Sequence, residues 1–240
     1  ARGGGVFVAE KGTFTMSGGS IAGCTAVGGY SHGGGVCNEG TMTLSGTAEI
    51  RDCHAKDSDG DTAYGGGISD IGGVSQISGD VRITGCTASG GGTDAMSMYT
   101  GRVISGGTFD GSMGNEGTIS GGIFNGKVVN SGTITDGTFN GDVVNEPNGT
   151  ISGGAFNGTV TNYGTITEGA ISGVTVTYRV NDADYATQVL QQGDQITLPV
   201  PAKLGCAFDG WYKDGTKWDA ATPVTESLTL TGWLYSPVTC

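Results

Sequence analysis

The chain has 240 residues, of which 49 are glycine and 5 are proline, and its formal net charge is −12. This acidic balance argues against nucleic acid as a partner, because binding nucleic acid requires a basic surface. No stretch approaches the roughly 20 apolar residues of a membrane-spanning helix, so we expect no membrane insertion. The glycines follow no Gly-X-Y period, which excludes collagen, and regularly spaced apolar residues argue against disorder.

A wide repeat occupies the first hundred residues. The motif GGGV at Gly3–Val6 recurs at Gly33–Val36 and, as GGGI, at Gly65–Ile68, with spacings of 30 and 32 residues. Each unit continues with short runs of the GVFV, FTMSG and SIAG type. Short runs rich in Thr, Val, Ile and Phe and separated by glycine predict β-strands. We therefore expect three short strands in each coil of a wide section, residues 1–100.

A repeat of fifteen residues, with one two-residue insertion near Pro147, follows over residues 104–173. A unit this short cannot bury its own apolar side chains, so the copies must stack, and like residues then form continuous internal columns. The aligned apolar columns are Ile104, Ile119, Ile134, Ile151 and Ile166; Phe109, Phe124, Phe139 and Phe156, continued by Ile171; and Met113, Val128, Val143 and Val160.

Asparagine also recurs in columns. One contains Asn115, Asn130, Asn145 and Asn162, and the other contains Asp110, Asn125, Asn140 and Asn157. Asparagine tolerates the left-handed backbone conformation that a coil corner needs. Stacked side-chain amides can also hydrogen-bond from coil to coil. We therefore interpret both columns as structural.

These repeats predict an all-β parallel β-helix solenoid over residues 1–173, with the right-handed crossover that parallel strands prefer. The pattern GGGV…GTFTMSGG…TA resembles the glycine-rich parallel β-helix repeats of bacterial surface proteins, which are pectin-lyase-like in architecture. Because the chain opens within a repeat, and an uncapped solenoid end exposes unpaired strand edges, we expect a fragment of a longer protein. Open ends would also allow end-to-end self-association.

Residues 174–236 have a different composition, with less glycine and more Lys, Tyr and Trp. The strand VTVTY, the segment GDQITLPVPAKLG, the core FDGWY at Phe208–Tyr212, and the later KWD, TPV and LTLTGW resemble the Listeria–Bacteroides repeat, or internalin B-repeat. Cys206 departs from that pattern, where an aromatic residue usually stands. The resemblance implies a small β-grasp-like domain of secreted or wall-attached bacterial proteins. We expect this module to cover the last solenoid coil, where a cap is required.

The six cysteines form no regular framework, so the sequence leaves their disulfide status open. Cys24, Cys53 and Cys86 occupy equivalent repeat positions. Their parallel Cβ vectors fit a disulfide poorly, so we predict a buried column of thiols. Cys37 is expected to point outward, and Cys206 and Cys240 could pair within the module.

An acidic insertion, KDSDGDTAYGGG, contains Asp57, Asp59 and Asp61. Carboxylates at alternate positions around a glycine turn can converge on Ca²⁺, which is the one metal site that the sequence suggests. No bidentate Glu follows at the right spacing, and Thr62 stands where such a loop has glycine. A solvated acidic turn without any cofactor is the alternative.

Catalysis requires converging groups, and the chain offers few of them. Its two histidines are His32 and His54, and His54 is adjacent to Cys53 on a predicted strand, so the two side chains point to opposite faces. Pectin-lyase-like enzymes use carboxylates with calcium and a basic residue on one outer face. Residues that could line such a face here are Arg51, Arg82 and Arg102, with Asp80 nearby.

The sequence thus predicts a non-catalytic extracellular or wall-attached bacterial surface protein, an adhesin or structural stalk. An unidentified glycan or protein partner would contact the irregular loops Ala55–Tyr64 and Gly90–Thr100. The alternative is a carbohydrate-binding or polysaccharide-degrading β-helix, since this architecture hosts both roles. Alignment of Tyr30, Tyr64 and Tyr99 on one groove would favour sugar binding, and scattered tyrosines would favour the stalk.

Overall fold

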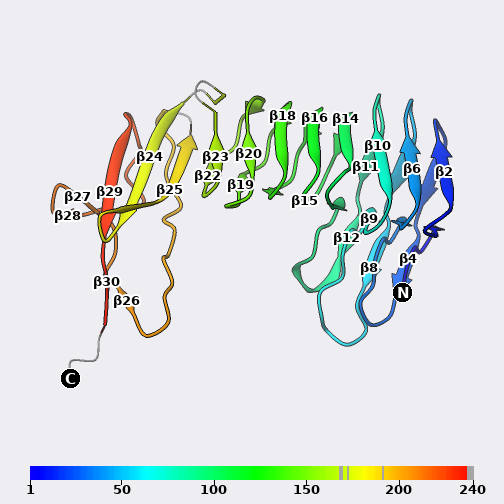
Figure 1. The fold of residues 1–240 in the computed structure, drawn as a ribbon, viewed down its shortest axis with the longest axis horizontal. Helices are drawn as coiled ribbons and strands as arrows, with labels where there is room; N and C mark the ends of the chain where they lie inside the picture. The colour runs from blue at the N-terminus through cyan, green and yellow to red at the C-terminus, as the bar shows by residue number, and fades with distance from the viewer. Residues whose placement is uncertain (168–169, 172, 191, 237–240) are drawn as a thin grey trace.

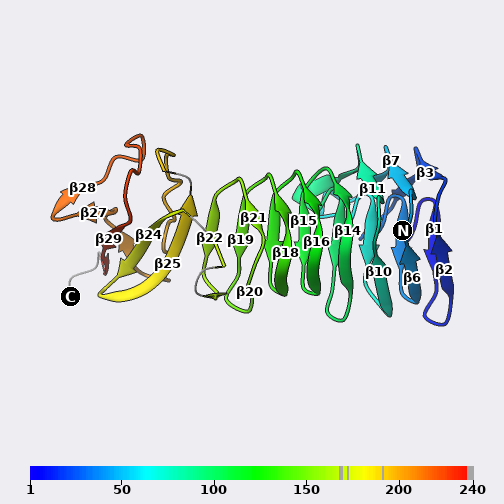
Figure 2. The same ribbon diagram turned by 90° about the horizontal axis from the view of Figure 1, so that it is seen from above.

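The computed structural model describes residues 1–167, 170–171, 173–190 and 192–236. The fold is all-β, with 48% strand and 1% helix. Coils stack in chain order along the long axis, from the N-terminus to a C-terminal module at the other end (Figures 1 and 2). Long parallel sheets run through this stack, which confirms the predicted all-β solenoid. Its handedness and the pectin-lyase-like relationship stay predictions.

Each wide coil contains four strands. The strands of the three wide coils are β1 (Val6–Val8), β2 (Thr13–Met16), β3 (Ser20–Ala22) and β4 (Thr25–Val27); β5 (Val36–Asn38), β6 (Thr41–Leu44), β7 (Glu49–Arg51) and β8 (His54–Lys56); and β9 (Ile68–Asp70), β10 (Val74–Ile77), β11 (Arg82–Thr84) and β12 (Thr87–Ala88). The expectation of three strands was wrong, because the segment after each column cysteine pairs as a separate sheet, β12-β8-β4. A short 3₁₀ turn, η1 (Ser89–Gly91), follows β12.

The narrow coils comprise β13 (Met96–Met98), β14 (Val103–Phe109), β15 (Met113–Asn115), β16 (Thr118–Phe124), β17 (Val128–Asn130), β18 (Thr133–Phe139), β19 (Val143–Asn145), β20 (Thr150–Ile151), β21 (Ala155–Phe156), β22 (Val160–Asn162) and β23 (Thr165–Ile166). The narrow coils that contain β14, β16 and β18 have fewer and longer strands than predicted, whereas the coil of β20, β21 and β22 has the three short strands expected. In β14, β16 and β18 the first two predicted faces form one strand, and its register shifts near a central glycine, which is Gly107, Gly122 or Gly137. Gly107 and Gly122 adopt φ of 99° and 109° there, which favours glycine.

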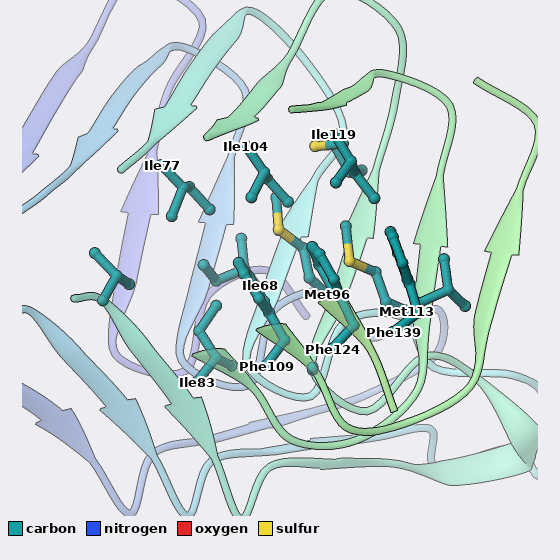
Figure 3. Packing of buried hydrophobic residues seen from close by; sticks show 14 of the residues in the cluster. Ile68, Ile77, Ile83, Met96, Ile104, Phe109, Met113, Ile119, Phe124 and Phe139 are labelled. Atoms are coloured by element: carbon teal, nitrogen blue, oxygen red, sulfur yellow. The ribbon is translucent and has the colours of Figure 1, made fainter. Parts of the chain in front are cut away.

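Strand register places like residues directly above one another. Ile104 pairs with Ile119, Phe109 with Phe124, and Met113 with Val128, and the later coils continue each column. The four phenylalanine rings stack with centroid separations of 5.0, 4.9 and 4.8 Å and interplanar angles of 10° or less. Figure 3 shows Phe109, Phe124 and Phe139 in one row and Ile77, Ile104 and Ile119 in another. The predicted internal columns are therefore present.

Both asparagine columns form hydrogen-bonded ladders. In the buried ladder, each Nδ2 donates to the next Oδ1 over 2.6, 2.6 and 2.7 Å, from Asn115 through Asn130 and Asn145 to Asn162. The second ladder, through Asn125 and Asn140, lies on the exposed surface. None of these residues has a positive φ, so the corner explanation was wrong: glycine supplies the left-handed positions, and asparagine supplies the amide stacking.

The C-terminal module contains β24 (Val174–Val180), β25 (Ala183–Leu190), β26 (Ala207–Phe208), β27 (Tyr212–Lys213), β28 (Thr216–Lys217), β29 (Leu228–Gly232) and β30 (Leu234–Tyr235). Strand β25 pairs antiparallel with β22, so the module extends the 13-stranded sheet of the solenoid. The Asn162 amide also donates to Thr187 Oγ1 at 3.3 Å. The module therefore covers the last coil, as predicted, while its β-grasp assignment stays a prediction.

Aromatic residues supply much of the module's core. Trp211 and Tyr178 are buried, with ring centroids 4.8 Å apart, and Phe208 and Trp218 pack against the same cluster. Trp211 Nε1 donates to the Pro199 carbonyl at 2.7 Å, which satisfies the one polar atom of the buried indole. This small core needs such large side chains, because a domain of this length buries little apolar surface.

We predict that Phe124→Asp abolishes the cooperative unfolding of the narrow coils, because the carboxylate would lie between two phenylalanine rings. The matched control is Ile123→Asp, the adjacent residue on the outer face, whose side chain is 43% exposed. Thermal and urea unfolding of both variants checks this. A cooperative transition of Phe124→Asp near that of the parent would contradict the assigned column.

The buried amide ladder yields a second prediction. Asn130→Ala removes the partners of the Asn115 amide and the Asn145 carbonyl, and each buried group left unpaired costs about 1–3 kcal/mol. Asn140→Ala, in the exposed ladder, should change the free energy of unfolding by about 0.5 kcal/mol or less. Urea unfolding of both variants checks this. Equal losses of unfolding free energy would mean that burial of the ladder adds nothing to the stability of the protein.

Candidate functional site

The acidic loop is organised around the Asp57 carboxylate. Asp57 Oδ1 accepts the backbone N–H groups of Asp59 at 2.8 Å and Asp61 at 3.2 Å, and Oδ2 accepts the N–H of Tyr30 at 2.5 Å. These backbone donors, Asp59 foremost, lower the pKa of Asp57. The carboxylate thus closes its own loop and ties it to the corresponding loop of the preceding coil.

The three aspartates are not brought together as metal ligands. Within the described residues, no group of three or more His, Cys, Asp or Glu side chains is placed to hold a metal ion. Asp57 uses both oxygens on backbone N–H groups, and Asp59 Oδ1 accepts a hydrogen bond from Ser58 at 3.0 Å. The side chains of Asp57, Asp59 and Asp61 therefore do not converge in this structure, and Ca²⁺ binding by this loop stays a prediction.

An open groove of about 730 Å³, which we call the glycine groove, lies on the solenoid. Its lining residues are Gly19, Ser20, Thr47, Glu49, Gly79, Asp80, Arg82, Gly107, Thr108, Gly122 and Ile123. Pairing of β3, β7, β11, β14 and β16 places Ser20, Glu49, Arg82, Thr108 and Ile123 in one register column. The groove therefore runs along the solenoid axis, across successive coils.

The expected row of three arginines is not formed. Arg82 and Asp80 line the glycine groove, but Arg51 is a surface residue that pairs with Glu49 at 3.4 Å and Asp52 at 3.0 Å. Arg102 is buried elsewhere in the fold. Only one of the three predicted basic residues therefore reaches this groove.

Arg102 instead forms a buried ion pair with Asp70, where the wide coils meet the narrow ones. Arg102 Nε lies 3.3 Å from Asp70 Oδ1, and the two side chains are 6% and 0% exposed. Asn38 Nδ2 donates to the same Asp70 oxygen at 2.8 Å, so Asp70 occupies the column that asparagine fills in other coils. Burial raises the pKa of Asp70. Sequence reasoning missed this pair, although an aspartate in an asparagine column was a signal.

The cysteine column is present, with Cys53 and Cys86 buried as predicted and Cys24, in the first coil, only partly buried. Pairing of β4, β8 and β12 places Cys24, Cys53 and Cys86 in register, and all three are free thiols. The contact between the two neighbouring thiols lowers the pKa of Cys53 and raises that of Cys86. Cys37 is a buried free thiol, and burial raises its pKa to about 11. The suggested partner of Cys206, Cys240, lies outside the described residues.

The histidines make separate contacts that pair neither of them with a cysteine. His32 Nδ1 lies 3.0 Å from Ser69 Oγ, and its ring stacks on Tyr64 with a centroid separation of 5.3 Å. His54 Nδ1 lies 2.8 Å from Thr87 Oγ1. These contacts give both rings structural roles on the coil surface.

The tyrosines only partly meet the sugar-binding criterion. Tyr64 and Tyr99 line one pocket of about 200 Å³, which we call the tyrosine pocket. Tyr30 is not among its lining residues and is 69% exposed in the turn held by Asp57. Two of the three tyrosines are therefore brought together, by the loops predicted to carry recognition.

Residues 175–231 match the family model of the Listeria-Bacteroides repeat domain. This repeat is typical of extracellular bacterial surface proteins, so the match supports that class for the chain. No curated protein and no solved structure matches the chain. Within the part that the structure describes, no helix is long and apolar enough to cross a membrane.

The buried ion pair yields a prediction. Arg102→Met leaves the Asp70 carboxylate buried without its cation and should cost about 3–5 kcal/mol of unfolding free energy. The double variant Asp70→Asn/Arg102→Met should recover much of that loss, because an amide can continue the contact with Asn38. Arg51→Met, which breaks exposed pairs, should cost about 0–1 kcal/mol. Similar losses for Arg102→Met and Arg51→Met would contradict the buried pairing.

Proposed function

We propose that the chain is a non-catalytic segment of a secreted or wall-attached bacterial surface protein, an adhesin or a structural stalk. The observation that carries this proposal is the antiparallel pairing of β22 with β25. Through it, one sheet of 13 strands runs from the first coil into the Listeria-Bacteroides repeat domain.

A continuous sheet supports the role of a stiff rod. Each coil is hydrogen-bonded to the next, and the repeat domain is joined by strand pairing rather than by a linker alone. Bending at this junction would require breaking the backbone hydrogen bonds between β22 and β25. Such a rod can hold lateral loops away from a cell surface, where they meet a glycan or protein partner.

The glycine groove supports a non-catalytic reading. Its charged side chains are accessible to solvent: Asp80 and Arg82 are exposed, and Glu49 is partly exposed. Charged groups that catalyse reactions are held in water-excluded sites, where their electrostatic effect is large. An open polar groove along the rod axis suits contact with a partner better than it suits bond cleavage.

Carbohydrate binding is the second candidate function, and a specific observation favours it. The tyrosine pocket combines Tyr64 and Tyr99 with hydroxyl and carboxylate side chains. Aromatic faces beside a few convergent polar groups are typical of small-ligand sites. A non-catalytic rod that binds sugars would fit both the adhesin and the carbohydrate-binding protein.

The test is an array of glycans and host-matrix proteins probed with the whole chain, once with Ca²⁺ and once with a chelator. We expect specific binding that the chelator leaves unchanged, because the Asp57 carboxylate is occupied by backbone N–H groups. Loss of binding in the presence of the chelator would instead support a Ca²⁺ site in the acidic loop. Absence of binding to every glycan and every protein would contradict the adhesin and leave the stalk.

A further inference from the structure

The tyrosine pocket has features that the rod itself does not require. It lies where the two irregular loops flank the outer face of β13, β15 and β17. Its lining residues are Tyr64, Thr93, Ser97, Met98, Tyr99, Gly114, Asn115, Glu116, Val129 and Ser131. We propose that this pocket binds a single neutral or amino-sugar residue of a glycan. This inference rests on the proposed extracellular binding function and names its ligand class and its site.

The first argument is an interrupted stack of rings. His32 and Tyr64 occupy neighbouring coils, and their rings stack at 5.3 Å with an interplanar angle of 14°. One coil further on stands Thr93, whose hydroxyl accepts the N–H of Gly65 at 3.1 Å. Tyr64 is still 36% exposed, so its ring is held by His32 while part of its surface stays open. A sugar ring can continue such a stack, because its C–H face packs on an aromatic face.

The second argument is a set of polar groups without partners. Among the described residues, no hydrogen bond or ion pair engages the hydroxyls of Tyr64, Tyr99 and Ser131 or the carboxylate of Glu116. Burial, and then the nearby Glu116, raise the pKa of Tyr99, so its hydroxyl remains a donor at neutral pH. Donors and acceptors gathered on one pocket match the many hydroxyls of a sugar.

The third argument is charge and size. Glu116 is the charged residue among those that line the pocket, and the chain carries a net charge of −12. This field disfavours acidic sugars and favours neutral sugars or the ammonium group of an amino sugar. The volume of about 200 Å³ lies below the roughly 300–1,000 Å³ of pockets for drug-sized ligands. One sugar ring therefore fits better than a long oligosaccharide buried along its length.

The experiment measures binding of the whole chain to immobilised neutral, amino-sugar and acidic glycans, followed by calorimetric titration with the best monosaccharide. Tyr99→Ala should weaken binding about tenfold or more, as expected when one aromatic contact and one hydrogen bond are lost. The matched control, Tyr30→Ala, removes an exposed tyrosine outside the pocket and should stay within about twofold of the parent. Glu116→Gln should reduce the preference for amino sugars over neutral ones. Melting temperatures establish that each variant is folded.

The outcomes separate this inference from the proposed function. Sugar binding that Tyr99→Ala and Tyr30→Ala affect equally would overturn the site and leave the adhesin intact. A preference for acidic glycans would overturn the ligand class. Binding to matrix proteins without binding to any sugar would overturn the inference alone. Absence of binding to every probe would overturn both the inference and the adhesin function.

Discussion

The structure depends on one constraint: in a stack of parallel strands, each side chain lies directly above its equivalent in the next coil. Strands pair at about 4.8 Å, so a side chain is stable only if it packs well against a copy of itself at that distance. Flat phenylalanine rings, branched isoleucines and asparagine amides all satisfy this condition. The ring separations of 4.8–5.0 Å and the amide contacts of 2.6–2.7 Å are consequences of it.

The same constraint explains where the solenoid changes character. At the boundary between wide and narrow coils, Asp70 and Met98 replace asparagine in the buried ladder, and Arg102 compensates the carboxylate. At the other end, the ladder finishes on Thr187 of the repeat domain, and β25 covers the last coil. The carboxylate at one end of the ladder and the amide at the other therefore each keep a side-chain contact.

The candidate functional features lie where the repeat is interrupted. The loops that break the period carry Tyr64 and Tyr99 to one pocket and hold Asp57 against the backbone of the preceding coil. Loops on a rigid scaffold are where recognition usually develops, because their sequences are released from the packing requirement. In the proposed surface protein, the rod would supply reach and stiffness, and the tyrosine pocket would offer a place for a ligand.

The sequence by itself determined the solenoid, its internal columns and the repeat domain, because a fifteen-residue period leaves stacking as the one way to bury the phenylalanine and isoleucine residues. It did not determine the fourth strand of the wide coils, the role of glycine rather than asparagine at the corners, or the pairing of Arg102 with Asp70. Nor did it reveal that Asp57 binds backbone N–H groups, or that Tyr64 and Tyr99 share a pocket while Tyr30 does not. The ion pair, the Asp57 contacts and the tyrosine pocket arise from contacts between coils at positions that no period relates. Only the tertiary structure decides which side chains meet there.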